Sequence, residues 1–109
     1  MTDDRVDKRR QAGLTPAMID AVETIIAADA RVRKVILFGS RAKGSWREGS
    51  DIDLAVYGDG LGRSDAARWT DDLEEALFPW SVDVVVVDNE VDADLRAHID
   101  RVGRVIFSQ

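Results

Sequence analysis

Three short apolar runs, separated by segments of helical periodicity, constrain the fold of this chain most. The apolar runs occupy residues 32–38, 51–57 and 82–87. Apolar residues recur at helical spacing in three further segments: 16–29, 64–77 and 92–102. Short runs bounded by glycine, proline or acidic residues are typical of strands, and the longer periodic segments are typical of helices. The order predicts an α/β (α+β) fold, with a mixed sheet of three to four strands and helices packed on one face.

The chain has 109 residues, which is the usual size of one domain. Residues 1–13 are charged and end in a glycine, so we expect a loose lead-in followed by a single domain over 14–109. No apolar run approaches the ~20 residues of a membrane span, and the first residues do not resemble a secretion signal. These features predict a cytoplasmic protein without a membrane contact. The absence of cysteine excludes disulfides and thiol catalysis, and a lone histidine excludes sites that need two imidazoles.

The charge of the chain is negative overall but locally positive in one stretch. A net charge of −6 disfavours direct binding of long nucleic acid, because that affinity depends largely on neutralising phosphates. Residues 30–46 nonetheless contain five basic side chains and no acidic one, and Arg47 adds a sixth. An acidic protein with one cationic patch is suited to a small polyanion.

Three aspartates are the candidate metal ligands. Asp51 and Asp53 are two residues apart in the second apolar run, so their carboxylates project from the same face of the strand. Asp83 interrupts the third run, and it can lie beside this pair if the third strand neighbours the second. Carboxylates held close together resist ionisation unless a cation compensates them. Mg²⁺, which prefers carboxylate and phosphate oxygens, is the expected cation.

The loop between the first two strands is the candidate phosphate site. Gly39 and Ser40 follow a strand end, where backbone N–H groups and a hydroxyl can form an anion cradle. Arg41, Lys43 and Arg47 lie in the same loop and are placed to neutralise phosphate oxygens. A metal-binding acid cluster opposite a phosphate cradle indicates nucleotidyl transfer, with two metals about 4 Å apart.

These residues resemble the signature of a known superfamily. Gly39-Ser40, ten residues and then Asp51-Ile52-Asp53 resemble the pattern of the polymerase-β-like nucleotidyltransferases. The string GSRAKGSWREGSDIDLAV resembles the minimal nucleotidyltransferase (MNT) branch of that superfamily. Residues 78–83 are similar to the approach to its third acid, and residues 99–107 to its closing helix and strand. The resemblance therefore covers nearly the whole chain.

The resemblance implies a nucleotidyltransferase fold and a set of roles. Asp51 and Asp53 are expected to bind two Mg²⁺ ions, and Asp83 to ligate the catalytic one. Gly39 and Ser40 are expected to grip the nucleotide triphosphate. The further candidates for nucleotide binding are Arg41, Lys43, Arg47 and Ser50.

The MNT branch also implies a partner. Its members are typically antitoxins that transfer AMP from ATP to a tyrosine of a helical HEPN-type ribonuclease and silence it. Larger relatives carry an extra domain for their acceptor, so a chain of 109 residues is expected to use a separate protein as acceptor and to form a hetero-oligomer with it.

Several alternatives remain open at the level of sequence. A binding subunit would neutralise or scaffold the HEPN-type partner by complex formation alone, and a third possibility is transfer to a small molecule such as an aminoglycoside. Ser50 has the alternative role of holding the loop ahead of Asp51 by bonding to its backbone. The single histidine, His98, is expected to be a surface or capping residue.

Overall fold

The computed structural model describes residues 14–39, 51–88, 91 and 93–109. Its elements, in chain order, are α2 (Pro16–Ile25), β1 (Val32–Phe38), β2 (Ile52–Gly58), α4 (Arg63–Ala76), β3 (Val82–Val86), α5 (Ala93–Val102) and β4 (Arg104–Ser108). The lead-in predicted for residues 1–13 lies outside the described residues. In the described part of the chain, no helix is long and apolar enough to cross a membrane.

The four strands form one mixed sheet with the order β3-β2-β1-β4. β1 pairs antiparallel with both β2 and β4, whereas β2 and β3 are parallel and are connected through α4. This topology confirms the predicted mixed sheet and places the third predicted strand beside the second. The apolar C-terminal segment supplies the fourth strand.

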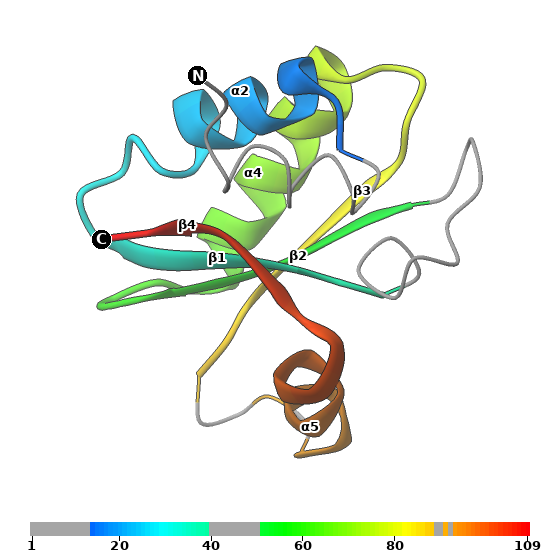
Figure 1. Ribbon diagram of the computed structural model, residues 1–109. Helices are drawn as coiled ribbons and strands as arrows, with labels where there is room; N and C mark the ends of the chain where they lie inside the picture. The colour runs from blue at the N-terminus through cyan, green and yellow to red at the C-terminus, as the bar shows by residue number, and fades with distance from the viewer. Residues whose placement is uncertain (1–13, 40–50, 89–90, 92) are drawn as a thin grey trace, which may run out of the picture.

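The larger core lies between the sheet and the helices α2 and α4, which share one side of it (Figure 1). Thr15 begins α2 as its N-cap, because its Oγ1 accepts a hydrogen bond from the N–H of Met18 at 3.2 Å. The helices contribute five buried apolar side chains: Met18, Ile19, Val22, Trp69 and Leu73. The alternation of β2 turns Ile52, Leu54 and Val56 into this core, as the sequence predicts.

The placement of the helices differs from the prediction in one respect, because α5 lies on the opposite side of the sheet (Figure 1). β1 and β2 present a second apolar patch there, formed by Ile36, Phe38 and Ala55. Ile99 of α5 is 1% exposed and packs against this patch. An apolar patch on a sheet must be covered, so the helices occupy both faces instead of one.

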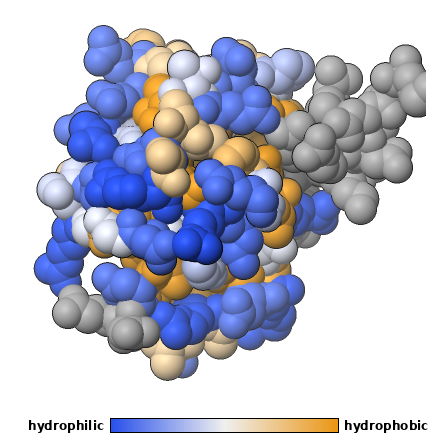
Figure 2. Space-filling view, turned by 90° about the vertical axis from the view of Figure 1, so that its left-hand side faces the viewer, coloured by the Kyte–Doolittle hydropathy of each residue, from blue (hydrophilic) through white to orange (hydrophobic). Residues whose placement is uncertain are grey.

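The face at the left of Figure 1 is mostly hydrophilic, with hydrophobic residues scattered among the polar ones (Figure 2).

β3 forms one edge of the sheet, and α4 covers part of that edge. The N–H groups of Val82 and Val84 donate to Glu74 Oε2 at 3.3 Å and to Thr70 Oγ1 at 3.2 Å. Open strand edges are templates for pairing with other chains, so these two side chains protect the first half of β3.

An ion-pair network fixes the start of α4. Asp65 is 7% exposed and accepts a hydrogen bond from the N–H of Gly62 at 2.9 Å. Arg31 pairs with Asp65 at 2.8 Å and with Asp29 at 2.7 Å, and Arg68 pairs with Asp65 at 3.2 Å. The hydrogen bonds from Arg31 lower the pKa of Asp65 and bring the pKa of Asp29 to about 2. We call these residues the Asp65 network.

Candidate active site

The predicted acids meet at one end of the sheet. In the parallel pair of β2 and β3, Asp53 stands directly opposite Asp83, and register partners of this kind turn their side chains to the same face. Asp51 immediately precedes β2. The arrangement is therefore the one that the sequence predicts for a third strand beside the second. We call these three residues the acid cluster.

Among the described residues, negative charge predominates around the acid cluster. Partial burial raises the pKa of the Asp53 carboxyl, and the negative charges of Asp83 and Asp51 raise it further. Within the part of the chain that the structure describes, His98 opposes these effects and lowers the pKa. Asp53 is half-buried, whereas the other two acids are exposed. Like charges placed together in this way are stabilised by a bound cation.

Gly39 brings the end of β1 against the acid cluster. Its φ of +74° belongs to the left-handed region, which favours glycine. A Cβ atom at this position would also collide with Asp53 Oδ2. Both the backbone conformation and the available space therefore require glycine, and they place the predicted phosphate turn directly beside a predicted metal ligand.

The remaining predicted nucleotide-binding residues lie outside the described residues: Ser40, Arg41, Lys43, Arg47 and Ser50. Of the predicted site, the structure thus places Gly39, Asp51, Asp53 and Asp83, and it brings these four to the same end of the sheet.

The acid cluster fits a divalent cation by the chemistry of its donors. Its ligands would be carboxylate oxygens, which Mg²⁺ prefers, and the raised pKa of Asp53 reflects a charge that a cation would neutralise. Within the described residues, no three acidic or histidine side chains are already gathered closely enough to hold a metal ion. The strand register therefore supplies the positions of the ligands without drawing their side chains together.

His98 is half-buried and lies beside this site, which the prediction of a surface or capping residue does not indicate. Its ring meets the ring of Phe38 edge-on, with centroids 6.2 Å apart and planes at 83°. Phe38 is the register partner of Asp53 in the β1–β2 pair. The signal that could have placed His98 is the apolar character of consecutive residues in β1, which requires a helix on each side of the sheet.

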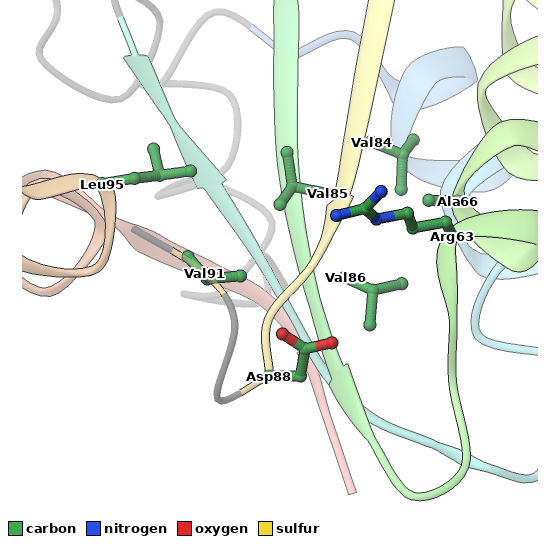
Figure 3. A pocket seen from close by; sticks show the side chains of 8 residues that line it. All are labelled: Arg63, Ala66, Val84, Val85, Val86, Asp88, Val91 and Leu95. Atoms are coloured by element: carbon green, nitrogen blue, oxygen red, sulfur yellow. The ribbon is translucent and has the colours of Figure 1, made fainter. Parts of the chain in front are cut away.

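A cavity of about 310 Å³ opens along β3, between the start of α4 and α5 (Figure 3). Its lining is mostly apolar and consists of Arg63, Ala66, Val84, Val85, Val86, Asp88, Val91 and Leu95. Of the predicted site residues that the structure describes, which are Gly39, Asp51, Asp53 and Asp83, none lines it. Figure 3 shows Arg63 extending from α4 toward β3, with Asp88 beyond the end of the strand.

Comparison with known protein sequences identifies one family and one relative. Residues 20–109 match the family model described as polymerase beta, nucleotidyltransferase. A stretch of 29 residues is 55% identical to a protein from Methanocaldococcus jannaschii that is provisionally named a protein adenylyltransferase. That match spans 27% of this chain and 29% of the relative, which is less than a third of the relative's length.

Solved structures share the fold at low sequence identity. A crystal structure of a toxin–antitoxin with AMP-PNP superimposes with a TM-score of 0.72 and 20% identity, over 84% of this chain and 73% of that chain. The structure of a tri-AMPylated Shewanella oneidensis HEPN toxin in complex with MNT antitoxin gives 0.67 and 18%, over 84% and 71%. A provisionally named nucleotidyltransferase from Sulfolobus solfataricus gives 0.56 and 19%, over 100% and 91%.

These structural similarities establish the fold. The family model spans most of the chain and also establishes the family. The matched residues include every described member of the candidate site, from Gly39 through Asp51 and Asp53 to Asp83. The chain therefore belongs to the polymerase beta nucleotidyltransferase family.

Proposed function

We propose that this protein transfers AMP from ATP to a hydroxyl group, expected to be that of a tyrosine, on a HEPN-type partner, and thereby acts as its antitoxin. The observation that carries the proposal is the register of Asp53 opposite Asp83, with Gly39 packed against the first of them. Supporting it, the structures with this fold include an MNT antitoxin bound to a tri-AMPylated HEPN toxin. A second such structure is a toxin–antitoxin with AMP-PNP.

The acid cluster would hold two Mg²⁺ ions, with Asp51 and Asp53 shared between them and Asp83 on the catalytic one. When bound, such ions neutralise the triphosphate and orient the attacking and leaving oxygens. The turn at Gly39 and Ser40 would hold the phosphates through its N–H groups. Arg41, Lys43, Arg47 and Ser50 would contribute further contacts to the nucleotide.

Asp83 would face the acceptor. It lies on β3, the edge strand, and its side chain is exposed, so a hydroxyl on the surface of another protein can reach it. Asp83 would orient this hydroxyl and help to remove its proton. The acceptor oxygen would then bond to the α-phosphorus of ATP while the bond to pyrophosphate breaks, leaving AMP on the partner.

The test uses ATP labelled in its α-phosphate, together with Mg²⁺ and the partner protein. We expect label on the partner with the natural protein and none with the double variant Asp51→Ala/Asp53→Ala. The matched control is Asp71→Ala/Asp72→Ala, which removes two exposed carboxylates from α4 and should leave labelling unchanged. Labelling that survives loss of Asp51 and Asp53 would refute the proposal.

The same variants separate catalysis from docking. A subunit that neutralises its partner only by forming a complex would need no acid cluster, so the double variant would still inhibit the partner at equal concentration. We expect this variant to lose inhibition that depends on ATP. Labelling of a free small acceptor in the absence of any partner would instead favour transfer to a small molecule.

A further inference from the structure

His98 lies on α5, the helix that covers the face of the sheet carrying Asp53 and Asp83. Phe38 and Asp53 are neighbours across β1 and β2, and the His98 ring packs edge-on against Phe38 with centroids 6.2 Å apart. β3, with Asp83, lies on the other side of β2. The imidazole therefore stands at the β1 side of the acid cluster, away from the strand proposed to receive the acceptor.

The imidazole nitrogens are available to a ligand. Within the described residues, neither nitrogen of His98 has a hydrogen-bond partner, although its ring is oriented by Phe38. No buried side-chain nitrogen or oxygen in that part of the chain lacks a partner. The His98 nitrogens therefore reach solvent. A neutral imidazole offers one N–H donor, and a protonated one offers two.

The position of His98 also suits an anion. Phe38, on which the ring packs, directly precedes Gly39 at the turn proposed to hold the triphosphate. A polyanion that enters beside three carboxylates needs hydrogen-bond donors on its other sides. These observations place a donor on the nucleotide side of the site.

We propose that His98 donates a hydrogen bond from its imidazole to a phosphate oxygen of the bound nucleotide. This inference rests on the proposed function, because it requires a nucleotide at the acid cluster. It assigns a binding role to a residue outside the Gly-Ser and Asp-x-Asp pattern, on a helix that the pattern does not include.

The experiment compares variants that separate the ring of His98 from its N–H. His98→Phe keeps an aromatic ring against Phe38 and removes the donor, whereas His98→Gln keeps a donor and removes the ring. Leu95→Ala is the control, because Leu95 packs in the same apolar patch under α5 and has no polar group. The affinity of each protein for AMP-PNP is measured by titration calorimetry with Mg²⁺ present, and its thermal midpoint is measured in parallel.

We expect His98→Phe to weaken AMP-PNP binding about tenfold or more, as loss of a hydrogen bond to a charged group does. His98→Gln should recover most of that affinity. Leu95→Ala should lower the thermal midpoint without a selective loss of affinity. If His98→Phe does not fold, His98→Leu replaces it, since it keeps an apolar side chain against Phe38 and removes the donor.

Two results would overturn the inference while leaving the proposed function intact. One is unchanged AMP-PNP affinity in His98→Phe when the natural protein binds the nucleotide. The other is an equal loss of affinity in His98→Phe and His98→Gln, which would assign the effect to shape instead of the N–H. Absence of AMP-PNP binding by the natural protein would count against the proposed function itself.

Discussion

Two groups of aspartates in this molecule are built in opposite ways. In the Asp65 network, Arg31 bonds to both Asp29 and Asp65, and the pKa of each carboxyl falls. In the acid cluster, Asp53 meets two further acids and partial burial, and its pKa rises. The first group favours the folded state unaided, whereas the second opposes it until a cation or substrate binds. The contrast separates the carboxylates that stabilise the fold from those that we propose for the chemistry.

The largest expected effect is on activity, from Asp53→Asn. Nucleotidyl transfer should fall at least about 1000-fold, because the variant removes a proposed metal ligand. Thermal stability at pH 7 should rise by a few degrees, since functional sites often trade stability for activity. The pKa of the Asp53 carboxyl is raised in the folded state. The stabilisation that comes from this shift is therefore fully present below the unfolded pKa of 3.8, where the carboxyl is protonated, and it is lost as pH rises through the raised folded pKa.

Thermal melting across pH checks this prediction. The gain in stability should disappear near pH 3, where Asp53 is protonated in both states. An Asp53→Asn protein less stable than the natural one at pH 7 would remove the contrast between the two groups of aspartates.

The second effect is on both stability and activity, from Gly39→Ala. We expect a loss of about 1–3 kcal/mol in unfolding free energy, because a left-handed residue gains a side chain where Asp53 already lies. Gly60→Ala is the matched control, since Gly60 has a φ of +70° but open space around it. Its cost should be about 1 kcal/mol.

Chemical denaturation measures both losses. Adding Asp53→Ala to Gly39→Ala should restore part of the stability, because it removes the group that the new methyl meets. Equal losses for the two glycine variants, with no recovery in the double variant, would show that Gly39 does not pack against the acid cluster.

The third effect is on stability alone, from Asp65→Asn. The substitution weakens the pairs with Arg31 and Arg68 and the cap at Gly62, so the thermal midpoint should fall by about 5 °C. Transfer activity should be unchanged. Asp59→Asn is the control, since its pair with Arg33 joins side chains that are 75% and 69% exposed, and its effect should be within about 2 °C.

The smallest effect concerns how the free energy of unfolding changes at acidic pH. A lowered folded pKa gives stabilisation that is present above the unfolded value of 3.8 and is lost as pH falls toward about 2, the pKa of Asp29. Arg31→Gln should therefore flatten the dependence of unfolding free energy on pH between about 4 and 2. A variant with the same slope as the natural protein would show that Arg31 does not hold these carboxyls.

Much of the fold and part of the site follow from local patterns. The alternation of Asp51, Asp53 and the apolar residues between them predicts which face of β2 carries the acids. The interruption by Asp83 predicts its place beside them, and the structure places it there. The predicted boundaries shift by one residue in most elements; α2 ends at Ile25, where a turn replaces its predicted last residues.

The position of α5 could not be derived from helical periodicity. The periodicity shows that a helix has an apolar stripe, but it does not show which face of the sheet the stripe packs against. The decisive information lies in β1, where Val35, Ile36, Leu37 and Phe38 are all buried. Consecutive buried residues in a strand mean that both faces are covered. The neighbourhood of His98 depends on this tertiary contact, so the sequence alone could not show that His98 lies beside Phe38 and the acid cluster.

The hydrogen bonds from the backbone of β3 to side chains of α4 have a consequence for self-association. Thr70 and Glu74 occupy backbone amides that a second strand would otherwise use, so the helix that buries one face of the sheet also limits its lateral growth. Any assembly that extends the sheet through the first half of β3 must first detach these two side chains. A partner that approaches Asp83 loses less free energy if it binds through side chains and leaves the hydrogen bonds at the edge of β3 intact.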